Sequence, residues 1–320
     1  MKSSISFKLS PARLLPLATL GALAAGSLIL SACGGGGSSS TSTQPTTQSV
    51  TLRFKALAGN APVQCGNLIT GLGSGNTSAQ LKDLRFYVAN IKLIRQDGTR
   101  VALQLTADDW TQVKGNDTVS LIDLENGTGA CSAGTAAMNA SLTGTAPTAT
   151  YVGVEYTLGV PFALNHTDYA TATKPLDVQA MAWSWQVGRK FAKVEVTDPD
   201  GAAGTWIAKT FNVHLGSTGC TGNPANGETV SCVAPNRGTV VLNSFDPATQ
   251  AIALDVQALL AGNDITRNQA GATGCMSGGT DPECAKVFEA LAIDWKADGT
   301  GTGQPLAPAK LSTVFKAVAP

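Results

Sequence analysis

"VTLRFKAL", residues 50–57, carries the clearest evidence of the fold in this sequence. Val50, Leu52, Phe54 and Ala56 occupy every second position, with threonine, arginine and lysine between them. Successive side chains of a β-strand point to opposite faces, so this alternation predicts a strand with one buried face. Comparable strand-like segments follow at 84–94, 118–124, 151–160, 180–187, 191–197, 205–215, 238–245 and 251–257.

Turn signals separate these segments, and long helical periodicity is scarce. The turns are "QDG" at 96–98, "ENG" at 125–127, "DPDG" at 198–201 and "FDPAT" at 245–249. The best predicted helix is "DPECAKVFEALA" at 281–292, where Asp281 can cap the helix and Pro282 suits its first turn. The sequence therefore predicts a mainly β protein: one antiparallel β-sandwich-like domain with short helices and disulfide-stapled loops.

The start of the chain is typical of an exported lipoprotein. Residues 1–32 combine three positive charges with an apolar run, which predicts a signal peptide. "LSAC" at 30–33 resembles a bacterial lipobox, so we expect acylation of Cys33; an ordinary secretory signal with an incidental cysteine is the alternative. Residues 33–49 form a Gly/Ser/Thr-rich tether, and the predicted domain occupies 50–320. Gly34 in place of an aspartate favours, by resemblance to Gram-negative lipoproteins, an outer-membrane-anchored protein of the cell envelope, on its periplasmic or surface face.

The charge balance argues against a nucleic-acid partner. Removing residues 1–32 takes three of the 22 basic residues and none of the 22 acidic ones, which leaves a formal net charge of −3. Nucleic acid requires a basic patch, which this composition does not suggest.

Six cysteines follow Cys33, and an even number in an exported chain predicts disulfides. Spacing alone allows about 15 connectivities. Closure of short loops favours Cys220–Cys232 and Cys275–Cys284, which leaves Cys65–Cys131. The sequence has no CxxC and no CxxCH, so we expect neither a zinc ribbon nor a haem attached to this chain. It also lacks GxSxG, HExxH and a P-loop, and we do not expect an enzyme.

"MAWSWQVGRKF", residues 181–191, places two of the five tryptophans two positions apart. In a strand, Met181, Trp183 and Trp185 would share one face. Two tryptophans on the apolar face of a sandwich are ordinarily core residues. An unmodified indole nitrogen is a hydrogen-bond donor only, so neither ring is a good metal ligand as it stands.

The sequence has only two histidines, and both are candidate ligands. His214 in "FNVHLGSTGC" is predicted on the more polar face of a strand, and His166 in "PFALNHTDY" in a loop. Each could equally be a hydrogen-bonded or surface residue. Two imidazoles are too few for a structural zinc site, but with one soft ligand they would suit Cu(I).

Taken together, several segments of the chain resemble the MbnP family, the methanobactin-associated proteins also described as the four-cysteine "metallo-mystery pair" proteins. The matching segments are "LRFYVANIKLI", "LENGTGAC", "LGVPFALNH", "MAWSWQVGRKF", "HLGSTGC" and "GCMSGGTDPEC", spread in order over 50–295. The resemblance implies an exported, copper-associated protein. It also implies a di-haem cytochrome c peroxidase-like partner of the MauG type, which oxidises a tryptophan to kynurenine. Related surface proteins hold copper with histidines and kynurenine.

On this resemblance, Trp183 or Trp185 is the modification site, and the opened ring would join His166 and His214 as a copper ligand. Met181 could act as a soft ligand or simply pack. Asn212 stands where the family pattern has a second histidine, a departure that would weaken or alter the site. Two alternatives remain: a carbohydrate-binding module, which needs exposed rings for stacking, and a structural envelope module, which needs buried ones.

Overall fold

The computed structural model describes residues 46–184, 186–306 and 312–320. The predicted signal peptide, Cys33 and most of the tether lie outside the described residues, as does Trp185. Residues Gln44–Pro320 form one unit. The first strand begins at Thr47, slightly before the predicted start of the domain at residue 50.

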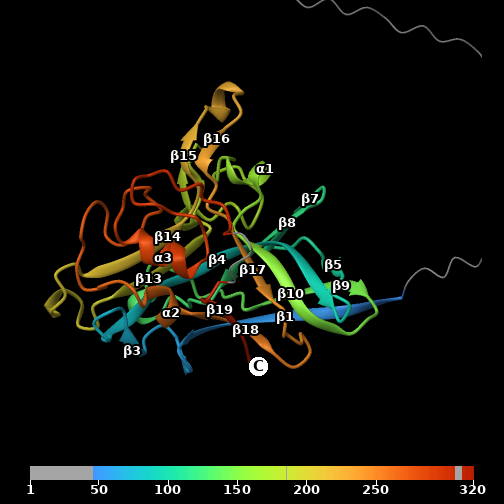
Figure 1. Ribbon diagram of the computed structural model, residues 1–320, viewed down its shortest axis with the longest axis horizontal. Helices are drawn as coiled ribbons and strands as arrows, with labels where there is room; N and C mark the ends of the chain where they lie inside the picture. Colours follow the sequence, from blue (N-terminus) through green and yellow to red (C-terminus); the bar gives the residue numbers. More distant parts are fainter. Residues whose placement is uncertain (1–45, 185, 307–311) are drawn as a thin grey trace, which may run out of the picture. The chain divides into compact units, whose positions relative to one another are not determined.

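Two large sheets make up this unit (Figure 1). The smaller has the order β19-β18-β1-β9-β6, with β2 beside β1: β1 (Thr47–Ala58), β2 (Ala61–Pro62), β6 (Gln104–Leu105), β9 (Ser141–Pro147), β18 (Ala251–Asp255) and β19 (Phe315–Val318). The larger has the order β14-β13-β4-β10-β17, with β3, β5, β7 and β8 attached: β3 (Leu68–Leu72), β4 (Thr77–Arg95), β5 (Arg100–Ala102), β7 (Thr111–Lys114), β8 (Asp117–Asp123), β10 (Tyr151–Leu158), β13 (Ala192–Thr197), β14 (Thr210–Leu215) and β17 (Gly238–Leu242).

Two small hairpins and a few short helices complete the described chain. The hairpins are β11 (Ala182–Ser184) with β12 (Gly188–Arg189), and β15 (Thr218–Thr221) with β16 (Ser231–Ala234). The α-helices are α1 (Phe162–Asn165), α2 (Val256–Leu260) and α3 (Cys284–Ala290); the 3-10 turns are η1 (Gly129–Cys131), η2 (Gln179–Met181), η3 (Gly201–Ala203) and η4 (Pro224–Asn226). Within the described ranges, no helix is long and apolar enough to cross a membrane.

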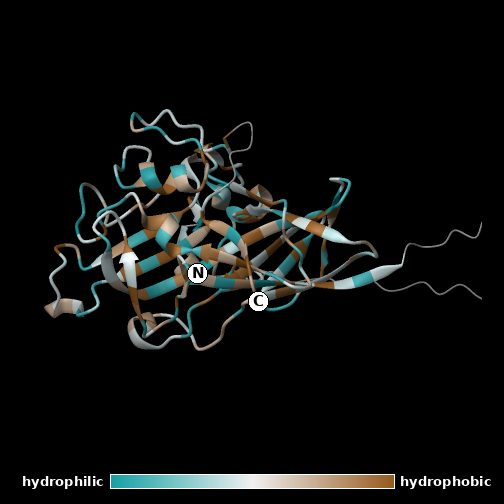
Figure 2. Cartoon of the chain, turned by 60° about the horizontal axis from the view of Figure 1, so that its bottom comes forward, coloured by the Kyte–Doolittle hydropathy of each residue, from teal (hydrophilic) through white to brown (hydrophobic). Residues whose placement is uncertain are grey.

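The predicted fold class is confirmed: the strands are mainly antiparallel and the two sheets share a core. Phe54 of β1 contacts Phe86 of β4 and Tyr156 of β10 edge to face, and Phe315 of β19 contacts the same two rings. The ring centroids lie 5.6–6.4 Å apart, so these four side chains join the sheets. Figure 2 shows the apolar residues concentrated along the strands. One pair departs from the prediction, because β1 and β18 run parallel.

β4 is the longest strand and the centre of the larger sheet. It contains the predicted segment 84–94, in which residues 84–89 are all buried instead of alternating with exposed ones. Asn90 has a φ of 51° and lies at a register shift against β10, so the strand bulges there. Its side chain binds Asp117 and the backbone of Thr118, which compensates for the interrupted ladder.

Residues 180–187 do not form one strand, contrary to prediction. η2 ends at Met181, β11 is short, and the chain turns back into β12. Gly188 has a φ of 94°, and Ser184 Oγ accepts a hydrogen bond from the Val187 amide, so this segment closes a tight turn.

Two other predicted boundaries are also wrong. β14 begins at Thr210 rather than 205, because Asp198 accepts the amides of Asp200 and Trp206 and holds the preceding residues in a loop. α3 begins at Cys284 rather than at 282, although Asp281 does accept the Glu283 amide.

The structure contains the three disulfides that the sequence predicts. Cys65–Cys131 spans 66 residues, Cys220–Cys232 bridges β15 and β16 across 12, and Cys275–Cys284 ties the start of α3 to the preceding loop across 9.

Candidate metal centre

His166 follows α1, and its hydrogen bonds define which ring nitrogen can bind a metal. Nδ1 lies 2.9 Å from the carbonyl oxygen of Gln186. A carbonyl oxygen only accepts hydrogen bonds, so Nδ1 carries the proton and Nε2 keeps the lone pair. Nε2 lies 3.2 Å from Nδ2 of Asn165, which donates to it. The neutral imidazole therefore presents Nε2 as its ligand atom.

The neighbours of Asn165 fix this arrangement. Asn165 is fully buried, and its Oδ1 accepts the Arg189 amide at 2.9 Å, which leaves Nδ2 as the donor toward His166. The buried guanidinium of Arg189 donates to the carbonyl oxygens of Asn165, Thr167 and Leu176. Burial lowers the pKa of Arg189, and these carbonyl groups replace the water that the cation has lost. The loop that carries His166 is thus fastened to β12.

His214 lies on β14 and is 7% exposed. Its Nε2 donates to Glu195 Oε1 at 2.7 Å. Burial lowers the pKa of His214 and outweighs the neighbouring carboxylate, so the ring is neutral at pH 7. With its proton on Nε2, the ring keeps its lone pair on Nδ1. A histidine oriented by a carboxylate in this way is a common arrangement among metal ligands.

Glu195 belongs to a buried group of charges across β4, β13 and β14. It lies 3.0 Å from Lys193, which also binds Asp83, and Asp83 binds Arg85. Burial raises the pKa of Glu195, but the hydrogen bond from His214 and the charge of Lys193 outweigh burial and hold that pKa well below its usual range. Glu195 is therefore ionised and keeps the His214 ring in one orientation.

The β11–β12 hairpin contacts the segments that carry both histidines. The Gln186 carbonyl binds His166. The ring of half-buried Trp183 lies against Gly216, two residues after His214: a Cβ on Gly216 would come within 2.4 Å of Trp183 Cζ3. Each imidazole nevertheless has its own partners, and no described contact joins the two rings directly. Their joint binding of one ion stays a prediction.

The remaining predicted site residues have different surroundings. Met181 is fully buried in the hydrophobic core. Asn212 lies on the same face of β14 as His214; its Nδ2 donates to the Thr273 carbonyl, while its Oδ1 is buried without a hydrogen-bond partner. Trp185 lies outside the described residues.

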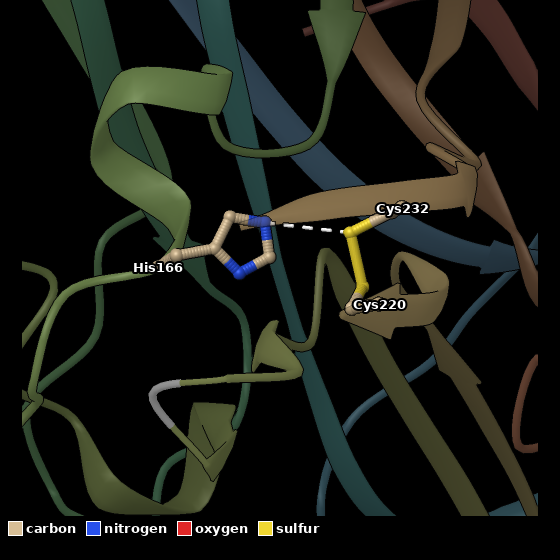
Figure 3. Close-up of side chains that lie close together, drawn as sticks. All are labelled: His166, Cys220 and Cys232. Atoms are coloured by element: carbon tan, nitrogen blue, oxygen red, sulfur yellow. Dashed lines mark hydrogen bonds between the residues drawn. A yellow bond between two sulfur atoms is a disulfide. The ribbon is translucent and has the colours of Figure 1, made fainter. Parts of the chain in front are cut away.

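Sequence reasoning missed two neighbours of the histidines. One is Glu195: the strand-like pattern at 191–197 predicts its strand, but not the pairing with β14 that brings it to His214. The other is the Cys220–Cys232 disulfide: Cys232 Sγ lies 3.6 Å from His166 Nε2 (Figure 3). No signal in the sequence connects His166 with a cysteine 66 positions later.

Comparison with known proteins agrees with this architecture. The sequence model of the MbnP family matches residues 47–277, well over half of the chain. The chain belongs to the MbnP family. Among solved structures, MbnP from Methylosinus trichosporium is similar over 86% of this chain and 99% of its own, with 34% sequence identity and a TM-score of 0.73. No curated protein matches the chain. The matched span of the MbnP family model contains His166, Trp183 and His214, and all three disulfides begin within it.

Proposed function

We propose that this member of the MbnP family is an exported copper-binding lipoprotein, and that a di-haem peroxidase-like partner of the MauG type oxidises Trp183 or Trp185 to kynurenine. The observation that carries the proposal is the β11–β12 hairpin, which holds Trp183 against the His214 segment and binds His166 through Gln186. The protein acts as a substrate and carrier rather than as an enzyme.

The side chains of this region fit a soft copper ion. Two neutral imidazoles, His166 through Nε2 and His214 through Nδ1, supply nitrogen lone pairs, and each N–H is bound by an oxygen acceptor. Nitrogen and sulfur donors suit Cu(I) better than oxygen donors do. The Asn212 amide oxygen is a poor Cu(I) ligand, so a third soft donor must come from elsewhere.

Ring opening of an indole would supply that third donor. Oxidation of the C2–C3 bond by two peroxide equivalents adds two oxygen atoms and gives N-formylkynurenine with two waters; hydrolysis then releases formate and leaves an aryl amine. The mass changes are about +32 Da for the first product and about +4 Da for kynurenine, and the oxidising chemistry belongs to the haems of the partner. Trp183 is half-buried, which suits a residue that must be oxidised from outside yet shielded afterwards.

The modification test uses the mature protein incubated with the di-haem partner and peroxide. We expect one of the two mass shifts on the peptide that contains Trp183 and Trp185, and none when both residues are phenylalanine. The unmodified protein is then compared with the modified one in a Cu(I) competition titration, in which His214→Ala and His166→Gln should each weaken binding by at least about tenfold. An active partner that leaves both tryptophans unchanged would refute the proposed modification.

Export and anchoring are tested separately. Cys33→Ala should abolish incorporation of labelled palmitate and release the protein from the membrane fraction, since acylation needs the cysteine thiol. Unchanged labelling in the variant would contradict the lipid anchor and would leave the copper proposal intact.

A structural envelope module is the second candidate, and the packing of the Trp183 ring on Gly216 favours it. In that case Trp183→Phe would lower the free energy of unfolding without changing copper binding. A carbohydrate-binding module would instead require an open ring face, whereas Trp183 is half-buried and its six-membered ring lies against Gly216.

A further inference from the structure

The Cys220–Cys232 disulfide lies beside His166 in an arrangement that the proposed function does not use. The two sulfurs and a ring nitrogen of His166 all lie within 4.8 Å of one another. Figure 3 shows one ring nitrogen of the imidazole turned toward the Cys232 sulfur, with the disulfide beside the ring. The cysteines belong to the β15–β16 hairpin and the histidine to the loop after α1, at the same end of the molecule (Figure 1).

We propose that Cys220–Cys232 is a reducible disulfide, and that its reduction creates a second soft-metal site in which Cys220, Cys232 and His166 bind Cu(I). This inference goes beyond the proposed function. It shares only His166 with the two-histidine site and does not depend on oxidation of a tryptophan.

Exposure distinguishes this disulfide from the other two. Cys220 and Cys232 are both half-buried, so a reductant can reach them. In the other disulfides Cys131, Cys275 and Cys284 are at most 1% exposed and Cys65 is 9% exposed. A dithiol reductant should therefore open the hairpin disulfide before the others.

Cys65–Cys131 also has a carboxylate, Glu125, within ligand distance. The two carboxylate oxygens of Glu125, however, already accept hydrogen bonds from the backbone amides of Gly127 and Thr135. Those hydrogen bonds give Glu125 a structural role, and the pair is too buried to compete as a reducible site.

The hairpin should keep its shape after reduction, because other contacts hold it. Cys220 and Cys232 are directly opposed in the β15–β16 ladder, with their Cα atoms 3.9 Å apart. Asn236 Nδ2 donates to the Gly216 carbonyl at the base of the hairpin. Gln186 Nε2 donates to the Gly222 carbonyl above the disulfide. The two thiols would thus stay beside each other and beside the loop that Gln186 also binds.

The orientation of His166 is already correct for a ligand. Its Nδ1 proton is engaged by the Gln186 carbonyl, so Nε2 is the nitrogen on the side of the sulfurs. There Nε2 accepts a hydrogen bond from Asn165 Nδ2, which a bound ion would replace. With metal–sulfur bonds of about 2.3 Å and a metal–nitrogen bond of about 2.0 Å, a trigonal ion needs N···S separations of about 3.7 Å and an S···S separation of about 4 Å. The nitrogen is 3.6 Å from Cys232 Sγ and within 4.8 Å of Cys220 Sγ, so the main change needed is a separation of the two sulfurs, which follows when their bond breaks.

A small dithiol can serve as the reductant of the Cys220–Cys232 disulfide. The dithiol becomes a disulfide and supplies two electrons and two protons, which break the S–S bond and yield two thiols. Binding of Cu(I) then releases both thiol protons to solvent and leaves two thiolates and one imidazole on the ion. Three soft donors suit Cu(I), whereas a structural zinc ion wants four ligands.

The experiment uses the mature protein under anaerobic conditions. A limiting dithiol is added and removed, free thiols are located by alkylation and peptide mapping, and Cu(I) is titrated against a chromogenic chelator. We expect labels only on Cys220 and Cys232, an unchanged circular dichroism spectrum, and, at saturating copper, one additional Cu(I) per chain compared with the oxidised protein. His166→Gln should weaken this extra binding by at least about tenfold.

Two controls separate the inference from the proposed function. His214→Ala should leave the extra Cu(I) unchanged while it impairs the two-histidine site. Cys220→Ser with Cys232→Ser should remove the extra Cu(I) but not the two-histidine site; alkylation of the reduced wild-type protein does the same if that variant does not fold. The inference is overturned if all three disulfides open together, if reduction adds no copper, or if blocked thiols still allow the gain.

Discussion

Replacing Glu195 by glutamine would remove the charge that orients His214 while keeping the shape of the side chain. Glu195 is 6% exposed and accepts the His214 Nε2 proton at 2.7 Å. Its carboxylate also lies 3.0 Å from Lys193 and 3.5 Å from Lys82. The glutamine amide can still accept one hydrogen bond, but it cannot balance the ammonium group of Lys193.

The expected cost follows from these contacts. Removing one partner of a buried ion pair typically destabilises a protein by about 3–5 kcal/mol. Here Lys193 retains Asp83, and His214 retains a neutral acceptor. We therefore expect Glu195→Gln to lower the free energy of unfolding by about 2–3 kcal/mol at pH 7.

The pH dependence gives a second and sharper expectation. The pKa of Glu195 is held below its usual value of 4.5, so its contribution is complete above pH 4.5 and is lost as the pH falls below it. The pKa of His214 is below 6.5, so the neutral ring contributes stability above pH 6.5 that is lost on acidification. Without Glu195 the buried ring resists protonation more, so the variant should lose stability faster below pH 6.5. The difference from the wild type should widen toward pH 5 and then shrink below pH 4.5.

Urea unfolding followed by circular dichroism, with the disulfides intact, measures both effects. Glu155→Gln is the matched control, because Glu155 makes the exposed ion pairs of the same sheet, with Lys92 at 3.0 Å and Arg100 at 2.5 Å. Such pairs contribute at most about 1 kcal/mol. If Glu195→Gln costs no more than the control, or if its effect does not change between pH 7 and pH 5, the buried-charge interpretation is wrong.

Three further substitutions test other parts of the structure. Gly216→Ala should lower the free energy of unfolding by about 1–3 kcal/mol and shift the tryptophan emission spectrum, because the new Cβ would lie 2.4 Å from the Trp183 ring. Gly238→Ala, whose new Cβ would have no contact closer than 3.6 Å, should cost less, and equal urea midpoints of the two variants would contradict this. The double variant Cys65→Ser, Cys131→Ser opens a loop of 66 residues and should lower the free energy of unfolding by about 4 kcal/mol. Thermal unfolding should show a larger loss than removal of the shorter Cys220–Cys232 disulfide causes. Burial raises the pKa of Asp123 to about 7, so the contribution of this one group to stability is lost as the pH rises from 4 to 7. Asp123→Asn should remove that contribution, and parallel stability profiles of the two proteins from pH 5 to pH 8 would exclude it.

The fold could be predicted from the sequence where local pattern and tertiary position agree. Val50, Leu52 and Phe54 alternate with polar residues, and they do face the core on β1. The disulfides were predictable because short loops close readily, and two local pairs leave one choice for the third. The segment 180–187 was not predictable in this way. Its strand-like composition is overridden by the turn at Gly188, whose glycine is required because a Cβ would collide with Asn165.

The candidate site was only partly predictable, because its decisive contacts are between distant residues. His166 and His214 stand out by rarity alone. Their partners do not: Gln186 follows His166 by 20 residues, and Glu195 precedes His214 by 19. These contacts exist only because the 162–176 loop packs on β12 and because β13 pairs with β14. The sequence can therefore identify His166 and His214 as candidate ligands, but it cannot predict which ring nitrogen of each carries the proton.

The two tautomers have different consequences for copper. Glu195 is a charged acceptor, and it makes the His214 ring a more basic and more rigid ligand than a neutral acceptor would, although burial lowers the pKa of the ring overall. The Gln186 carbonyl is a neutral acceptor, and His166 Nε2, which accepts a hydrogen bond from Asn165 Nδ2, already lies beside the Cys232 sulfur. An ion bound through His214 would thus be held mainly from β14. His166 is the ligand that can be shared, because opening of the neighbouring disulfide would offer its lone pair two thiolates in place of a second imidazole. Reduction of Cys220–Cys232 should accordingly weaken binding at the two-histidine site as it creates the thiolate site, and the total copper bound should rise by less at low copper concentration than at saturation.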